Sequence, residues 1–81
     1  MLIAAQIRAA RGLLGMSQTS LSELASVSPA TIKRVEAGNQ VRGSADTFRK
    51  IERALEAAGI EFIGPEGQKG PGVRLRAAPD G

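Results

Sequence analysis

Hydrophobic residues in two segments of this chain recur every three or four positions, the spacing of one side of a helix. In the first segment they are Ile3, Ile7, Ala10 and Leu14, and in the second they are Phe48, Ile51, Leu55 and Ala58. Gly15 and Gly59 follow these series directly, and glycine commonly marks the end of a helix. Ser44 precedes the second series and can cap its first turn. The pattern therefore predicts amphipathic helices at 2–14 and 44–58.

A shorter helix is predicted at 17–26, between those two. Its apolar positions are Leu21, Leu24 and Ala25, which share one side of a helix. Ser17 stands before this series, where a serine hydroxyl can accept a hydrogen bond from an unpaired amide of the first turn. The apolar register breaks at Ser26.

Another short helix is predicted at 28–37. Ser28 can cap it, and Pro29 suits its first position because the proline lacks only an amide that would be unpaired there. Ile32 and Val35 face inward, and Gly38 is expected to end the helix in the left-handed conformation. Two helices of this length joined by so short a turn predict a helix-turn-helix.

Residues 60–81 have a different pattern. Segments 60–63 and 73–76 are short, alternating and β-branched, which is typical of strands. Between them, 64–72 is rich in glycine and proline and is predicted to be a long, mobile loop, while 77–81 is expected to fray. A lone hairpin is only marginally stable in water, so it must pack on the helices or on another subunit. The expected fold is mainly α: a four-helix domain at 1–59 with a C-terminal β-hairpin or strand pair at 60–81.

The amino-acid composition excludes several kinds of site. The chain contains no cysteine and no histidine, so disulfides, thiolates and the commonest general base and metal ligand are missing. We therefore expect no enzyme activity, no metal and no cofactor. No apolar run approaches the length of a membrane span, about 18 residues, and we expect a soluble, cytoplasmic protein that does not act at a membrane.

Positive charge is concentrated in the half of the chain that contains the helix-turn-helix. Residues 1–43 carry five basic and two acidic side chains, whereas 44–81 carry six of each. A basic excess of this kind indicates a surface for a polyanion, and nucleic acid is the expected partner.

Specific residues strengthen that interpretation. They are Ser17-Gln18, Leu21, Val27-Ser28, Thr31-Ile32, Val35-Glu36 and Gly38. Their order and spacing resemble the lambda repressor and Cro-like (XRE-type) family of helix-turn-helix regulators, and the resemblance covers roughly residues 3–58. The chain departs from the family pattern at Ser22 and Ser26, where alanine and glycine are usual. Serine is small enough for the helix crossing, and Ser26 need not adopt a positive φ if the turn adjusts.

The resemblance implies that the second helix of the motif lies in the major groove of double-stranded DNA. The residues it places on the groove side are Ser28, Pro29, Ala30, Thr31, Lys33 and Arg34. Pro29 and Ala30 offer only apolar contact, for instance to a thymine methyl. Base discrimination would then depend mainly on Arg34, which can bridge guanine O6 and N7, with phosphate contact as its alternative role.

The resemblance also implies contacts to the DNA backbone and a structural ion pair. The phosphate candidates are Gln18, Thr19, Asn39, Gln40 and Arg42. Gln18 leads this group because it begins a helix, where backbone amides point toward an anion. Arg11 and Glu36 are expected to form a partly buried ion pair between the first and third helices, which is a structural role.

The predicted function is a sequence-specific DNA-binding transcriptional regulator, a repressor that occludes its operator as a homodimer. The candidate dimer contacts are Ile60, Phe62, Ile63, Val73 and Leu75. The other possibility for these strands is that they only cover the chain's own helices. An alternative function is an antitoxin, in which the helix-turn-helix binds its own promoter and the C-terminal region binds a toxin.

Overall fold

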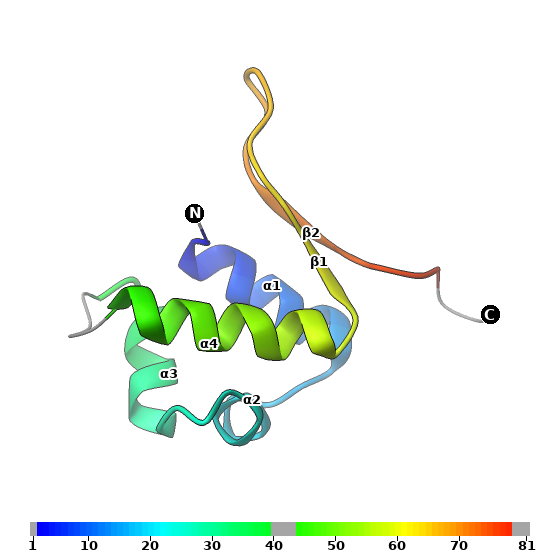
Figure 1. Ribbon diagram of the computed structural model, residues 1–81. Coiled ribbons are helices and arrows are strands. Elements are labelled where there is room, and N and C mark those ends of the chain that lie inside the picture. The colour runs from blue at the N-terminus through cyan, green and yellow to red at the C-terminus, as the bar shows by residue number, and fades with distance from the viewer. Residues whose placement is uncertain (1, 40–43, 79–81) are drawn as a thin grey trace.

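A computed structural model describes residues 2–39 and 44–78 of the chain (Figure 1). Its elements are α1 (Ala4–Leu14), α2 (Gln18–Ala25), α3 (Pro29–Glu36), α4 (Ser44–Ala57), β1 (Ile60–Ile63) and β2 (Gly72–Leu75). The structure thus confirms a mainly α fold of four helices followed by an antiparallel β-hairpin.

The helices meet around a small apolar core. Its buried members are Leu2, Ile7, Ala10, Leu21, Ala25, Ile32, Val35, Ile51, Leu55 and Ile60. Each helix contributes residues at the spacing that predicted it, because that spacing places them on one side of the helix. Phe48, Phe62, Val73 and Leu75 are partly buried and pack against this core.

Three positions assigned to inward faces are exposed instead. Leu24 is 59% exposed, because the buried side of α2 is formed by Leu21, Ser22 and Ala25. At 3.6 residues per turn, Leu24 points about 105° away from the centre of that side. Ile3 is 44% exposed because it is the extended N-cap residue that precedes α1, where helical periodicity does not apply. Ala58 is exposed because α4 ends one residue earlier.

The turn between α2 and α3 places Ser26 at a positive φ. This residue adopts a left-handed conformation, with φ 56° and ψ 44°, so the turn does not adjust in the way that would let it avoid one. This geometry lets the amide of Val27 donate to the carbonyl of Ser22 at 3.0 Å, which satisfies the end of α2. Gly38 also has a positive φ, 84°, as predicted for the end of α3.

One side of the hairpin lies against the helices. Ile60 pairs with Leu75, and Phe62 pairs with Val73, so these four side chains share one face. That face packs on the core beside α1 and α4. The other face carries Glu61, Ile63 and Arg74, and Arg74 donates to the Glu61 carboxylate there at 2.6 Å.

The hairpin continues beyond the two strands, so segment 64–72 is not a simple loop. Glu66 and Lys69 exchange backbone hydrogen bonds of 3.0 and 2.9 Å. Between them, Gly67 has a φ of 60°, a conformation that glycine adopts in tight hairpin turns. This outer part of the hairpin, residues 64–71, extends away from the helices on the opposite side of the molecule from α2 and α3 (Figure 1).

Gln6 of α1 holds the hairpin in place. Its side-chain amide nitrogen donates to the carbonyl of Ile63 at 3.3 Å and to that of Gly72 at 3.0 Å. Its amide oxygen accepts from the backbone amide of Ile3 at 2.9 Å. One buried side chain therefore links the start of α1 to both strands of the hairpin.

Candidate nucleic-acid interface

α2 and α3 form a helix-turn-helix at the end of the molecule opposite the hairpin (Figure 1). The Ser17 hydroxyl accepts from the Ser20 amide at 3.0 Å and begins α2. The Ser28 hydroxyl does the same for α3, accepting from the Thr31 amide at 3.2 Å. Both helices thus start at the predicted serine caps, which satisfy amides that would otherwise lack partners.

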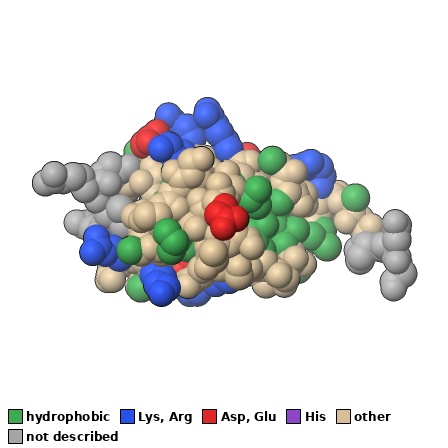
Figure 2. Space-filling view, turned by 90° about the horizontal axis from the view of Figure 1, so that it is seen from below, with side chains coloured by type: hydrophobic (Ala, Val, Ile, Leu, Met, Phe, Trp, Pro, Cys, Tyr) green, Lys and Arg blue, Asp and Glu red, His purple; other side chains and the backbone are tan. Residues whose placement is uncertain are grey.

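The inward face of α3 is narrow. Ile32, Val35 and Glu36 are its buried residues, and the rest of the helix faces outward or lies at the boundary. Ala30, Lys33 and Arg34 are exposed and spaced at i, i+3 and i+4, so they share the outward face. Figure 2, which views the molecule from below, shows basic side chains at several places around this face, including the side where α3 lies in Figure 1.

The six residues predicted to read bases are therefore together at the start and on the outer side of α3. Ser28, Pro29 and Ala30 are exposed, and Thr31 is half-buried. The Ser28 and Thr31 hydroxyls lie 2.8 Å apart in a mutual hydrogen bond. Lys33 and Arg34 make no side-chain hydrogen bond within the part of the chain that the structure describes, which leaves their donors available to a ligand.

The phosphate candidates divide into two groups. Gln18, Thr19 and Asn39 are described, and the latter two are exposed. Gln18 is half-buried, and its amide nitrogen donates to Glu36 Oε1 at 3.0 Å, so its side chain is tied to the end of α3. Gln40 and Arg42 lie outside the described residues.

Arg11 and Glu36 form a two-pronged ion pair between α1 and α3. Arg11 Nε lies 2.6 Å from Glu36 Oε2, and Arg11 Nη2 lies 2.7 Å from Oε1. Arg11 Nη1 donates to the carbonyl of Met16 at 3.0 Å. Such parallel bonds fix the relative orientation of the two side chains.

The pair shifts the titration of both groups. Burial opposes the charge on Glu36, which is only 5% exposed, but hydrogen bonds from Arg11 and Gln18 outweigh it and lower the pKa of the carboxyl. The hydrogen bond to Glu36 raises the pKa of Arg11, against a smaller effect of burial. Glu36 is therefore ionised at neutral pH, and its carboxylate accepts hydrogen bonds from Arg11 of α1 and Gln18 of α2.

Two residues in this region have roles that the sequence reasoning missed. Arg8 donates to the backbone carbonyl of Glu36, where the partial negative charge at the end of α3 favours a cation. Its position three residues before Arg11, on a neighbouring side of the helix, was the available signal. Gln6 carried no comparable signal, because its partners are backbone carbonyls 57 and 66 residues away.

The candidate dimer residues are mostly turned toward the chain's own helices. Ile60 is 1% exposed and belongs to the core, so it has no surface to offer a partner. Phe62, Val73 and Leu75 are half-buried against that core, and Ile63 is half-buried on the other face of the hairpin. Only partial side-chain surfaces and the strand edges remain for contact with a second subunit.

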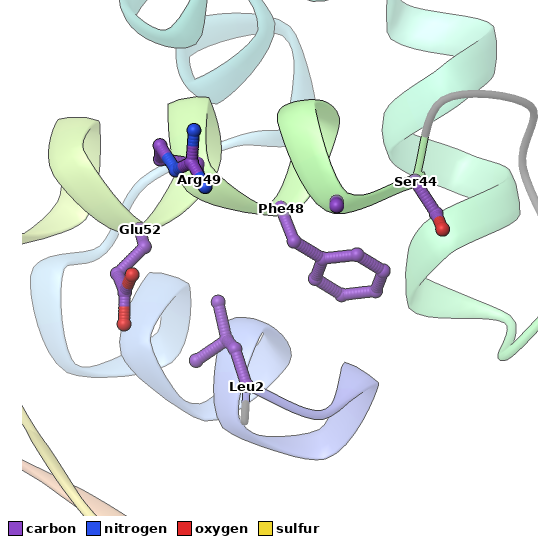
Figure 3. A pocket seen from close by; sticks show the side chains of 6 residues that line it. Leu2, Ser44, Phe48, Arg49 and Glu52 are labelled. Atoms are coloured by element: carbon purple, nitrogen blue, oxygen red, sulfur yellow. The ribbon is translucent and has the colours of Figure 1, made fainter.

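A hollow of 490 Å³ lies between the start of α1 and α4. Leu2 and Phe48 face each other across it, with Arg49 and Glu52 on one side (Figure 3). Within 2–39 and 44–78, no group of three or more acidic side chains is placed to hold a metal ion. The hollow is lined by the apolar residues Leu2, Ala45 and Phe48 and by the polar residues Ser44, Arg49 and Glu52.

Comparison with known proteins agrees with the geometry. Among the described residues, no helix has both the length and the apolar character needed to cross a membrane. A search of curated proteins found no match to this chain. A family model described as helix-turn-helix matches residues 7–61, which is more than half of the chain and includes all four helices apart from the start of α1. The chain therefore belongs to the helix-turn-helix family of lambda repressor-like, XRE-type DNA-binding transcriptional regulators.

Proposed function

We propose that this protein is a repressor that binds a palindromic operator as a homodimer and blocks transcription by occupying the DNA. The outward face of α3 is the observation that carries the proposal, since it presents Lys33 and Arg34, which have no side-chain partner among residues 2–39 and 44–78, beside the small side chain of Ala30. Repression by occlusion needs no further ligand or activation surface. No catalytic step is part of the proposal, because the chain lacks histidine and cysteine. The protein would act in the cytoplasm, where its operator lies.

A dimer follows from the size of the reading helix. α3 has 8 residues, so it spans about 12 Å and can contact only a few base pairs. Two copies bound to half-sites about 34–36 Å apart would double the sequence read and match the symmetry of a palindrome.

The hairpin is the proposed dimer element. Within the described residues β1 and β2 pair only with each other, so each strand has an outer edge with unpaired backbone groups. Such edges readily pair with another chain. Residues 64–71 also extend beyond the helices on the side away from α3, where a second subunit would not obstruct the DNA.

DNA selection and hydrodynamics together test this proposal. Selection from random DNA should enrich a palindrome, and sedimentation should show a dimer. Deleting 60–81 is a poor variant because it removes Ile60 from the core. Replacing residues 64–71 by a two-residue Asn-Gly turn preserves the strands and should yield monomers with weaker operator binding.

Gln68→Ala is the matched control, because Gln68 is exposed in the same turn and the substitution leaves the hairpin length unchanged. The control should remain dimeric and keep full affinity. An unchanged dimer in the shortened variant would refute the hairpin as the dimer element, and the absence of any enriched sequence would refute specific regulation.

The antitoxin function is the second candidate. The same feature favours it, because the outer hairpin is exposed, carries both Glu66 and Lys69, and points away from the DNA-binding side. Purification of the protein from its own host would distinguish the two functions. A stoichiometric small protein encoded by an adjacent gene, lost in the shortened variant, would support the antitoxin; a protein recovered always alone would exclude it.

A further inference from the structure

α1 has the residue pattern of a buried helix, yet one side of it faces solvent. Its polar side chains are Gln6, Arg8 and Arg11. Gln6 donates to the hairpin, and both arginines donate to Glu36 at the end of α3. A surface helix normally carries charged or polar residues opposite its buried stripe, and a helix that is apolar all round is normally covered on every side. The exposed side of α1 lacks that polar character.

This exposed side is a row of small residues that ends in a leucine. Ala5, Ala9 and Leu13 are spaced by four residues, so they form one ridge about 12 Å long. Leu13 is 47% exposed, and both alanines are exposed as well. Gly12 lies beside the ridge, and a Cβ atom added to it would meet no described atom within 4 Å. Glycine inside a helix is less favourable than alanine, and nothing in the described chain requires it here. Its presence indicates that another molecule approaches α1 closely.

A hollow of 220 Å³ adjoins the other end of this ridge. It lies between the start of α1 and the hairpin, and its apolar lining includes Ile3, Ala5, Ala9 and Val73. No charged side chain among residues 2–39 and 44–78 lines it. An apolar side chain therefore projects from one end of the ridge, and an apolar hollow that can receive one lies at the other.

A surface that carries both the projection and the hollow is complementary to itself. If two copies of α1 pack antiparallel about a two-fold axis near Ala9, Leu13 of each copy lies opposite Ala5 of the other, beside the hollow. A two-fold contact of this kind uses the same residues on both subunits. Each copy carries a net charge of +3, so two copies approach most easily where neither presents an exposed charge.

The proposed homodimer also needs more contact area than the outer hairpin offers. A standard interface takes about 800 Å² from each subunit. Residues 64–71 form a narrow ribbon with two arms of four residues, about 13 Å long, and cannot supply that area from one side. The exposed side of α1 adjoins the base of this ribbon, because Pro71 and Gly72 also line the hollow.

We propose that the Ala5–Ala9–Leu13 face of α1 is a contact surface for a second copy of this chain, with Leu13 of each copy seated in the hollow of the other. This inference rests on the proposed homodimer and names a surface that forms it together with the hairpin. Because Arg8 and Arg11 reach Glu36 from another side of α1, the face is turned away from the end of α3. The contact thus leaves the helix-turn-helix free to bind DNA.

A charge placed on the projecting side chain tests the contact. Leu13→Lys should preserve the far-UV circular dichroism spectrum, because the side chain is already half exposed. The two-fold axis repeats the change, so the dissociation constant of the dimer in sedimentation should rise by about 100-fold or more. Leu24→Lys is the matched control, since Leu24 is a leucine of α2 that is 59% exposed. The control should dimerise as the wild type does.

Cross-linking tests the position of the two-fold axis in an otherwise intact chain. The chain contains no cysteine, so a single introduced cysteine reports only on its own neighbours. Ala9→Cys should form an intermolecular disulfide under mild oxidation, because this bond requires Cα atoms within about 7 Å. Ala57→Cys, at an exposed alanine of α4, is the control and should not cross-link. More efficient cross-linking of Ala5→Cys than of Ala9→Cys would refute the antiparallel arrangement.

Gly12→Ala should have opposite effects on folding and on association. In the monomeric Leu13→Lys background it should raise the urea midpoint, because alanine favours the helix. In the otherwise wild-type chain the added methyl groups should obstruct close approach and raise the dissociation constant at least about tenfold. An unchanged dissociation constant would refute a close contact at this part of α1.

The outcomes separate this inference from the proposed function. A Leu13→Lys chain that stays dimeric, together with an Ala9→Cys chain that does not cross-link, refutes the α1 contact and leaves the dimer and its operator binding intact. A wild-type chain that is monomeric both free and on its selected DNA refutes the homodimer and this inference with it. An Ala9→Cys chain that cross-links in host extract only to a different protein overturns the assignment to a second copy.

Discussion

Replacing Arg11 by methionine tests whether the ion pair with Glu36 holds the motif together. From residues that the structure describes, the Glu36 carboxylate accepts three hydrogen bonds, two from Arg11 at 2.6 and 2.7 Å and one from Gln18 at 3.0 Å. Arg11→Met preserves much of the side-chain volume but removes two of the three. The carboxylate remains buried, with Gln18 as its one remaining side-chain donor among the described residues.

The expected cost follows from that count. A hydrogen bond to a charged group contributes about 1.5–3 kcal/mol, and removing one partner of a buried pair costs about 3–5 kcal/mol. We therefore expect the free energy of unfolding to fall by about 3–5 kcal/mol, a large share of the roughly 5–15 kcal/mol that stabilises a domain. Glu36→Gln should cost less, about 1–3 kcal/mol, because Arg11 is 21% exposed and can reach water.

The double variant gives a sharper result than either single change. Once Arg11 is methionine, Glu36→Gln removes the stranded charge, so adding it should raise stability. The two substitutions are then strongly non-additive, as expected for groups in direct contact. Far-UV circular dichroism with urea at fixed protein concentration is the appropriate measurement, because the chain has no tryptophan or tyrosine for fluorescence.

The pH dependence of the free energy of unfolding provides an independent test of the ion pair. The pKa of Glu36 is lowered in the folded protein, so the unfolded chain binds the proton more readily and the pair's contribution is present above the unfolded pKa, about 4.3. It is lost as pH falls through the lower folded pKa. In Arg11→Met, burial should instead raise the pKa of Glu36, so that its contribution to stability falls as pH rises through that raised value.

The stability difference between wild type and Arg11→Met should therefore shrink as pH falls from 7 to 4. A cost below about 1 kcal/mol, or a difference that does not change with pH, would show that the carboxylate is effectively solvated. Equal costs for the two single variants would refute the argument that Glu36 is the more buried partner.

Other substitutions test the turn at Ser26, the attachment of the hairpin through Gln6 and the outward face of α3. Ser26→Gly should stabilise the protein by about 1 kcal/mol by relieving the left-handed serine; a lower urea midpoint would contradict this. Gln6→Ala should lower hydrogen-exchange protection in β1 and β2 while leaving α3 protected, and uniform loss would show that Gln6 supports the whole fold. Arg34→Ala should cost about 1–3 kcal/mol of binding and relax preference at one base pair, whereas Lys33→Ala should weaken all sequences alike and reduce the salt slope by about one. Identical salt and sequence effects in gel-shift titrations would contradict these separate roles.

The helices were predictable because a helix that buries one face needs apolar residues at every third or fourth position. Ile7, Leu21, Ile32 and Leu55 follow this spacing and are buried. Periodicity does not specify the centre of the buried face, however, and Leu24 shows the consequence. In α2 the small residues Ser22 and Ala25 face inward with Leu21, so the larger Leu24 is left in solvent.

The contacts that position the site were less accessible from the sequence. Arg11 and Glu36 could be paired only through family resemblance, since 25 residues separate them. The attachment of Gln6 to the hairpin depends on the backbone carbonyls of Ile63 and Gly72, and a carbonyl carries no residue-specific signal. The conformation of Ser26 could not be decided from the sequence, because it depends on the closing of the α2 end through the Val27 amide, which outweighs the modest strain of a left-handed serine.

The narrow inward face of α3 has a consequence for how such a protein can change its target. Ile32, Val35 and Glu36 attach the helix to the rest of the fold, while Ala30, Lys33 and Arg34 contribute nothing to the core. Mutations on the outer side are therefore close to neutral for stability. Gene duplication followed by drift at those three outer positions could produce a paralogue with a new operator without passing through an unfolded intermediate. The same separation makes α3 a practical place to graft a different binding preference onto this scaffold.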